Sequence, residues 1–198
     1  MGHTKRTSGS TRLTYRGKQR FEHWLRDRQV YFITARVRGR APAFAAGEAK
    51  AAFWDAFDHY SAECGFVPWV TSLLDNHYHT LGYLRRGSEL PRMMRGLHGR
   101  TAKRVNDLLE AHGRARIKPF WIDTGKQNYF DGCIRDERQC RRAYRYTLTQ
   151  AVWHGVCGDW RDYPHTRIDV GVDKAVRRAL ELGAFLEGVR YKRYEGRS

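Results

Sequence analysis

Two consecutive runs of β-forming residues, separated only by a turn, most constrain what this chain can fold into. Residues 66–74 and residues 77–84 each read as a strand, and Pro68 lies near the start of the first, where a missing donor is tolerated. Asp75 and Asn76 between the runs are typical turn residues. The two runs therefore predict a β-hairpin.

The remaining elements alternate around this hairpin. Apolar periodicity, β-branched runs and glycine stops predict strands and helices in the order strand, helix, strand, strand, helix, strand, helix. Outside the hairpin, these are a strand at 30–37, a helix at 47–64, a helix at 88–112, a short strand at 119–122, a helix at 136–154 and a helix at about 173–187. This order predicts an α+β fold of ferredoxin-like topology, an antiparallel sheet with helices packed on it.

Composition limits the class of partner. The chain has 198 residues, enough for one sizeable core. It has 37 Lys and Arg against 21 Asp and Glu, a formal charge of +16, which predicts attraction to polyanions, most often nucleic acid. Hydrophobic residues at 41% and aromatic residues at 13% are too many for a disordered polycation.

Several classes are excluded by missing signatures. No run approaches the 18 apolar residues of a membrane span, and the N-terminus lacks the apolar segment of a secretory signal, so we expect a cytoplasmic protein without a membrane partner. The four cysteines have irregular spacing and no Cys-x-x-Cys pair, which argues against a zinc ribbon and favours reduced, mostly buried thiols. Common nucleotide, zinc-protease and serine-hydrolase motifs are absent.

The first candidate for chemistry is the pair His77 and His79 on the second strand of the hairpin. Side chains at i and i+2 share one face of a strand, so both imidazoles project the same way, as metal ligands do. His-x-His is a short pattern that also arises by chance. A solvated or hydrogen-bonded histidine pair is therefore the alternative interpretation.

The second candidate is the pair Tyr146 and Gln150, four residues apart on a predicted helix and so one above the other on one face. Arg142 lies one turn before Tyr146 and Arg145 lies beside it, so the phenol could be held near a phosphate. The alternative is that Tyr146 packs against the sheet with its hydroxyl hydrogen-bonded, as buried tyrosines commonly do.

Together these segments resemble a known family. Residues 73–81 resemble the strand carrying the His-hydrophobic-His (HUH) motif of single-tyrosine insertion-sequence transposases. Residues 146–155, followed by 160–164, look like the catalytic helix and its exit in the REP-associated tyrosine transposase branch. The likeness covers roughly residues 30–165 and implies the ferredoxin-like HUH domain.

The chain departs from the family pattern at two places. Asp75 stands where proline is usual, and Gln150-Ala151 replaces an Asn-Pro pair. A glutamine four residues after the tyrosine is familiar among the wider insertion-sequence transposases, where it completes the metal site, so Gln150 is interpreted as a ligand. Tyr144 is the second candidate nucleophile.

The resemblance implies a reaction and its cofactor. Tyr146 would be the catalytic nucleophile, and His77, His79 and Gln150 would bind Mg²⁺ or Mn²⁺. The substrate would be single-stranded DNA with a folded hairpin, cut and rejoined through a 5′-phosphotyrosine, by a monomer or a homodimer. The alternatives are a non-catalytic single-stranded nucleic-acid-binding module of the same fold and a metal-dependent nuclease that uses water.

Binding and domain organisation complete the expectations. The candidate DNA-contacting residues are Arg16, Lys18, Arg36, Arg92, Arg95, Arg142 and Arg145. For any one of them, a solvated basic face is the alternative. The chain divides into a basic arm at 1–29, the transposase domain at 30–165, and a C-terminal helical extension with a basic tail at 166–198.

Overall fold

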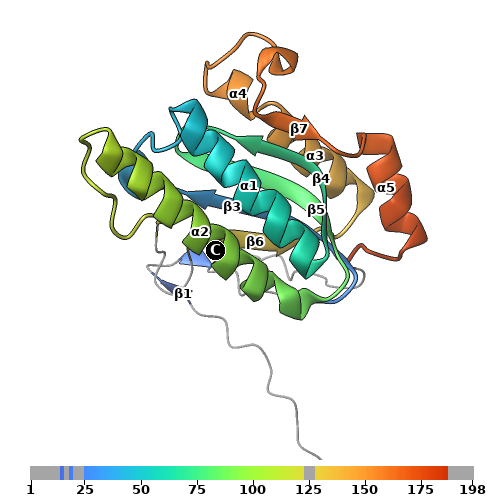
Figure 1. The fold of residues 1–198 in the computed structure, drawn as a ribbon. Helices are drawn as coiled ribbons and strands as arrows, with labels where there is room; N and C mark the ends of the chain where they lie inside the picture. Colours follow the sequence, from blue (N-terminus) through green and yellow to red (C-terminus); the bar gives the residue numbers. More distant parts are fainter. Residues whose placement is uncertain (1–13, 16–17, 20–24, 123–127, 187–198) are drawn as a thin grey trace, which may run out of the picture.

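A five-stranded antiparallel sheet forms the centre of the computed structural model, which describes residues 14–15, 18–19, 25–122 and 128–186 (Figure 1). The strands lie in the order β6-β3-β5-β4-β7, so β5 is the middle strand. Their bounds are β3 Gln29–Arg36, β4 Phe66–Leu73, β5 His77–Leu84, β6 Phe130–Cys133 and β7 Thr166–Ile168. Two-residue strands β1 (Thr14–Tyr15) and β2 (Lys18–Gln19) form a separate small sheet.

Helices cover both faces of the sheet. On one face lie α1 (Gly47–Cys64) and α2 (Leu90–Ala111), and on the other lie α3 (Glu137–Leu148) and α5 (Val172–Glu181) (Figure 1). The short α4 (Gln150–Trp153) follows α3 directly, and three single-turn 3₁₀ helices are η1 (Arg38–Arg40), η2 (Gly87–Glu89) and η3 (Trp160–Asp162). The sheet therefore has a separate apolar core on each side.

The topology is ferredoxin-like, as the sequence predicts. The chain runs β3-α1-β4-β5-α2-β6, and β6 and β3 pair on one side of β5 while β4 pairs on the other. All neighbouring strands are antiparallel. The α+β class and the antiparallel sheet are confirmed.

Side chains along β5 point alternately to the two faces of the sheet, and each face has its own core. Tyr78 packs into the core under α1 and α2, where its ring lies 4.8 Å from that of Phe53. Leu81 belongs to the opposite core, with Cys140 of α3. Because side chains alternate along a strand, His77 and His79 share the Leu81 face and point toward α3.

The prediction of a strand at 119–122 is wrong. The fourth strand of the ferredoxin-like fold is β6 at Phe130–Cys133, which pairs with β3. Trp121 makes only one isolated bridge, to Val37. Phe120 and Trp121 are apolar because they fill the core under α1 and α2, where Trp121 stacks on His98 with ring centroids 4.2 Å apart. A short apolar segment indicates burial, and buried loops as well as strands are apolar, so the sequence pattern alone does not identify a strand here.

The C-terminal part also differs from prediction in detail. The helix expected at 136–154 is interrupted at Thr149 (φ −97°, ψ 10°), and the last helix ends at Glu181, two residues before the left-handed Gly183 (φ 57°). The sequence predicts no strand at Thr166–Ile168, where β7 lies. Since β7 extends the sheet and α5 packs on α3, residues 166–186 share the core of the sheet, and the division at residue 165 stays a prediction.

Two further expectations concern cysteines and membranes. All four cysteines are free, and Cys64, Cys133 and Cys140 are buried, as predicted. Within the described residues, the helices are too short or too polar to cross a membrane.

Candidate active site

The two predicted metal ligands lie side by side on the middle strand. His77 faces Arg36 and His79 faces Thr34 across the β3–β5 ladder. Both histidines are buried, with exposed fractions of 2% and 4%, and their ring centroids are 5.1 Å apart. The strand thus holds a rigid pair of imidazoles under the α3 layer.

The hydrogen bonds of this pair leave nitrogen lone pairs free. His77 Nδ1 lies 2.6 Å from Asn76 Oδ1, an acceptor, so Nδ1–H donates and Nε2 keeps its lone pair. His77 Nε2 and both nitrogens of His79 are buried without a hydrogen-bond partner. Buried polar atoms are nearly always satisfied, so these orphaned nitrogens fit a bound divalent ion.

The protonation state of the pair also suits a cation. Burial, with smaller contributions from the neighbouring His154 and Arg36, lowers the pKa of His77 to about 4, and burial together with the charges of His77, Arg36 and His154 lowers that of His79 to about 3. Both rings are therefore neutral near pH 7, the form that binds a metal.

Gln150 is placed to supply an oxygen donor. It is buried, and its Nε2 donates to Tyr146 O at 2.9 Å, which leaves its carbonyl oxygen out of that bond. The side chain of Gln150 interacts with both imidazoles and raises their pKa against the effect of burial, although their buried nitrogens have no partner at normal hydrogen-bond geometry. Among the described residues no three His, Cys, Asp or Glu side chains cluster as ligands, so an amide is the available third donor.

Tyr146 stands over the same pair. Its ring is edge-on to His79 at a centroid distance of 5.1 Å and edge-on to Phe32 at 6.0 Å, while Phe32 stacks on His79. The residue is 48% exposed. The phenol thus adjoins the candidate metal position and remains open to solvent.

Tyr144 occupies a structural position. It is buried on the opposite side of α3, about 200° around the helix from Tyr146. Its hydroxyl donates to Val170 O at 2.9 Å, and burial raises its pKa to about 12. Of the two tyrosines, the geometry leaves only Tyr146 accessible.

Positive charge gathers beside Tyr146. A hollow of about 420 Å³ on α3 is lined by four arginines and one carboxylate: Arg138, Arg141, Arg142, Arg145 and Glu137. Arg141 pairs with Glu137 and Asp173, whereas none of the ion pairs within the described residues includes Arg142 or Arg145. Arg36 is exposed at the end of β3, opposite His77.

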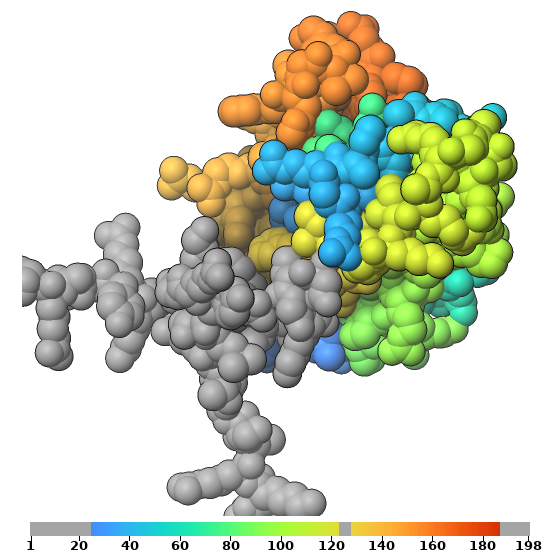
Figure 2. Space-filling model, turned by 90° about the vertical axis from the view of Figure 1, so that its left-hand side faces the viewer, coloured from blue at the N-terminus to red at the C-terminus, as the bar shows by residue number. Residues whose placement is uncertain are grey.

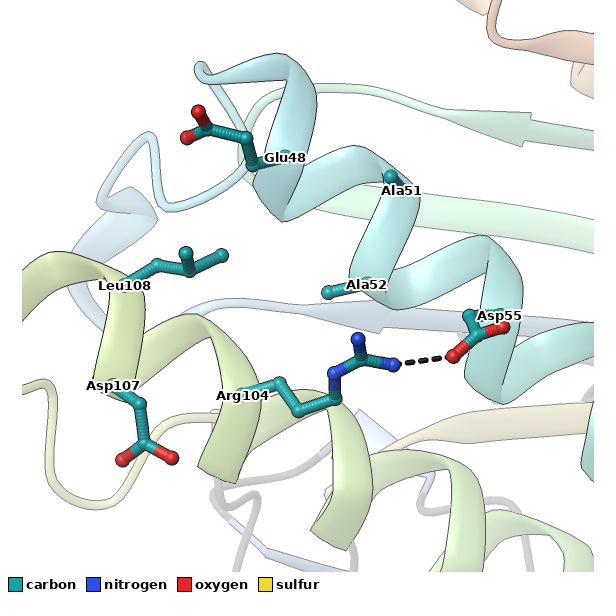
Figure 3. A pocket seen from close by; sticks show the side chains of 7 residues that line it. All are labelled: Glu48, Ala51, Ala52, Asp55, Arg104, Asp107 and Leu108. Atoms are coloured by element: carbon teal, nitrogen blue, oxygen red, sulfur yellow. Dashed lines mark hydrogen bonds and ion pairs between the residues drawn. The ribbon is translucent and has the colours of Figure 1, made fainter.

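The other predicted contacts lie elsewhere. Arg92 and Arg95 are on α2, across the sheet from the histidines, and Arg92 pairs with Glu63 and Glu89. Arg100 and Arg104, also on α2, share an ion pair with Asp55. The hollow between α1 and α2, about 680 Å³, is lined by three carboxylates (Glu48, Asp55 and Asp107), by Arg104 and by small and apolar side chains (Figure 3).

The two arm residues cannot be placed at the site. Lys18 lies in the short strand β2, and Arg16 lies outside the described residues.

Sequence reasoning missed three residues near the site. Asn76 orients His77, His154 places its ring 4.9 Å from that of His77, and Trp153 is 79% exposed. The last two lie on the lobe formed by α4 and the chain up to β7, at one end of the molecule (Figure 2, orange). The spacing of four residues from Gln150 to His154 was the available signal, since it repeats the spacing from Tyr146 to Gln150.

A ferredoxin-like sheet whose middle strand presents two histidines toward a helix bearing a tyrosine has the fold of HUH transposases. No family model and no curated protein matches the sequence. Among solved structures, this chain is similar to a REP-associated tyrosine transposase bound to a REP hairpin, with a TM-score of 0.58, 15% identity, and coverage of 84% of this chain and 87% of that one. A candidate transposase from Deinococcus radiodurans gives a TM-score of 0.44 at 10% identity, covering 63% and 92%.

Proposed function

We propose that this protein cuts and rejoins single-stranded DNA at hairpin sites through a 5′-phosphotyrosine at Tyr146. The observation that carries the proposal is the exposed phenol standing against His79, beside buried imidazole nitrogens that have no partner. The hairpin as substrate is taken from the structural relative, which was solved bound to a REP hairpin.

A divalent ion is the proposed cofactor, held by His77, His79 and Gln150. Two imidazole nitrogens and one amide oxygen leave open positions and suit Mg²⁺ or Mn²⁺. When bound, the ion would relieve negative charge on the non-bridging oxygens of the scissile phosphate.

The protein's own residues do the remaining work. The Tyr146 oxygen attacks phosphorus in line, forming the phosphotyrosine bond as the bond to the 3′ oxygen breaks. The phenol proton reaches the departing 3′ oxygen through solvent, releasing a 3′-hydroxyl. Because the phosphoester bond is kept on Tyr146, a 3′-hydroxyl of DNA can attack it and rejoin the strand without ATP.

Arg142, Arg145 and Arg36 are the proposed contacts to the phosphates flanking the cut. They are exposed on the side of the sheet that carries Tyr146, and none has an ion-pair partner among the described residues. Unpaired guanidinium groups can bind phosphate without first losing a carboxylate. Arg92 lacks this freedom because two glutamates already hold it.

The test is capture of the covalent intermediate. Purified protein is incubated with labelled hairpin-bearing single-stranded DNA and Mn²⁺, and a denaturing gel is examined for a slow band that retains the label. Wild type should give the adduct, and Tyr146→Phe and His77→Ala should give none. Tyr144→Phe is the matched control, since it removes only the hydrogen bond to Val170 and should keep the adduct.

Two outcomes would contradict the proposal. Cleavage that persists in Tyr146→Phe would identify a nuclease that uses water. Tight DNA binding without any cleavage by wild type, across hairpins of varied sequence, would identify the non-catalytic binding module.

A further inference from the structure

The helix that carries Tyr146 continues past the break at Thr149. The backbone N–H groups of Thr149 and Trp153 donate to Arg145 O and Thr149 O, each at 3.0 Å, so hydrogen bonds four residues apart run from α3 into α4. Burial keeps the same phase, because Gln150 is buried whereas Tyr146 and Trp153 are exposed. The two helices therefore present one continuous outer face.

Tyr146 and Trp153 share that outer face. Seven residues of an α-helix turn through about 700°, about 20° short of two full turns, and rise about 10.5 Å. The indole therefore lies on the same side of the helix as the phenol, about two turns further along. Arg142 and Arg138 lie about one and two turns before Tyr146, within about 80° of it around the helix. In chain order the face carries two arginines, the phenol and the indole.

The indole of Trp153 has no partner within the part of the chain that the structure describes. It is 79% exposed, the highest value among the large apolar side chains described, and no ring contact, cation–π contact or side-chain hydrogen bond there includes it. Trp160 on the same lobe differs, because Arg161 covers its ring with the guanidinium carbon 4.7 Å from the ring centroid. Covering the apolar face of Trp153 with a ligand is therefore favourable.

An exposed aromatic face in line with arginines fits an unpaired nucleotide. Proteins bind single strands through guanidinium contacts to phosphates and by stacking bases on aromatic side chains. A base inside a duplex is already stacked on its neighbours and must leave the stack before an indole can cover it. Stacked nucleotides of one strand are about 3.4 Å apart, so about 10.5 Å corresponds to about three nucleotides at most.

We propose that Trp153 stacks on an unpaired base within about three nucleotides of the phosphate that Tyr146 attacks, on the side of the cut opposite to the phosphates bound by Arg142 and Arg138. The inference rests on the proposed function, because attack by Tyr146 defines where the cut lies. It requires that the cut fall in an unpaired segment beside the stem of the hairpin, not within the stem. The other possible occupant of the indole face is a second copy of this chain.

The experiment removes single bases from the substrate. The cut on a hairpin-bearing single strand is located from the labelled covalent adduct, and an abasic site is then placed at each of the three nucleotides on either side. Fluorescence anisotropy without divalent metal, so that no strand is cut, gives the Kd for wild type and Trp153→Ala. On one side only, an abasic site should raise the Kd of wild type about tenfold and that of Trp153→Ala by less than about twofold.

Further variants separate stacking from apolar contact. Trp153→Phe keeps an aromatic face and should recover the sensitivity to the same abasic site, whereas Trp153→Leu keeps an apolar side chain without a ring and should behave like Trp153→Ala. Val156→Ala is the matched control, because it removes an apolar side chain of the same lobe that is 55% exposed and has no ring, and it should behave like wild type.

A second measurement pairs the unpaired tail with a complementary strand. Pairing should raise the Kd of wild type about tenfold and abolish the difference between wild type and Trp153→Ala, because the base is then held in a duplex. A difference that survives pairing would contradict stacking on an unpaired base.

The outcomes distinguish this inference from the proposed function. Equal sensitivity of wild type and Trp153→Ala at every abasic position, with the adduct still formed, would overturn the stacking and leave the proposed function intact. Sensitive positions on both sides of the cut would also overturn the inference. No adduct from wild type would overturn the proposed function, and a scan of the whole tail without a sensitive position would then exclude the base contact too. A smaller mass of Trp153→Ala in sedimentation, without a sensitive position, would identify a contact between copies of the chain instead.

Discussion

The ring of Tyr146 stands edge-on to the imidazole of His79, with centroids 5.1 Å apart and planes inclined at 79°. One residue comes from helix α3 and the other from the middle strand β5, and Phe32 of β3 supports both rings. The contact joins a candidate nucleophile to a candidate metal ligand across the interface between helix and sheet.

Replacing Asn76 should weaken metal binding although Asn76 touches no metal. Its side-chain oxygen accepts from His77 Nδ1–H and fixes the tautomer that leaves Nε2 free. We expect Asn76→Ala to raise the Kd for Mn²⁺ about 10–100-fold. Asn76→Asp keeps an acceptor at this position and should retain affinity, as measured by calorimetry. Equal loss in both variants would mean that the acceptor is not the cause.

Arg142→Gln should weaken DNA binding in a salt-dependent way. The guanidinium is exposed beside Tyr146 and has no ion pair within the described residues, so a phosphate can bind it directly. We expect the slope of log K against log salt concentration to fall by about 1. Arg100→Gln is the control, because Arg100 is paired with Asp55, and its slope should equal that of wild type. A smaller slope in both Arg142→Gln and Arg100→Gln would show that the ion pair with Asp55 does not prevent Arg100 from binding phosphate.

Trp153→Ala should reduce affinity for single strands. An indole 79% exposed, adjacent in the chain to His154, can stack on an unpaired base. Such stacking contributes about 1–3 kcal/mol per base, so the Kd should rise roughly tenfold, while Trp153→Phe should recover most of the affinity. Fluorescence anisotropy with a labelled single strand measures both. Leu180→Ala removes an exposed apolar residue of α5 and serves as the control.

Stability should fall as the pH drops from 7 to 5, partly because of His98. Burial lowers the pKa of His98 to about 3. Its Nδ1–H donates to Asn128 Oδ1 and its Nε2 accepts from the hydroxyl of Tyr78, which together suit the neutral ring. The unfolded chain takes up the proton near pH 6.5, so this stabilisation is complete above pH 6.5 and is lost progressively toward pH 3.

At pH 5 the loss from His98 alone should be about 2 kcal/mol. Urea unfolding of the metal-free protein at pH 7, 6 and 5 measures it. His98→Gln keeps hydrogen-bonding capacity without a titrating group, so its unfolding free energy should vary less with pH. If the unfolding free energy of His98→Gln fell with pH as much as that of wild type, other groups would be the cause. His77 and His79 are such groups, because their lowered pKa values also make the protein less stable as the pH falls.

Two glycines of α2 should respond oppositely to alanine. A Cβ on Gly96 would collide with the ring of Tyr60 on α1, whereas a Cβ on Gly99 would meet no atom within 4 Å. Gly96→Ala should therefore destabilise the protein by about 1–3 kcal/mol, and Gly99→Ala should stabilise it by up to about 1 kcal/mol through helix propensity. Thermal and urea unfolding measure both. Equal effects would show that the two helices are not in close contact at Gly96.

Most elements could be predicted because their signals are local. The strands β3 and β5 and helix α1 follow from short patterns of apolar residues and from the stop at Gly65, which adopts the left-handed conformation. The fourth strand could not be placed in this way. Two short segments with aromatic residues, the Phe120-Trp121 pair and β6, lie where the fourth strand is expected along the chain. Only β6 pairs with β3 as a strand, whereas Trp121 makes one isolated bridge, so pairing in the folded sheet decides which segment is the strand.

The sequence by itself determined the order of elements from β3 to α2, the shared face of His77 and His79, and the position of Gln150 one helical turn after Tyr146. These depend on the periods of strands and helices, which involve near neighbours only. Tertiary structure alone decided that Tyr144 is buried, that Arg92 is held by Glu63, and that His154 lies against His77. Those contacts join residues far apart in the chain, so they exist only once the helices have packed on the sheet.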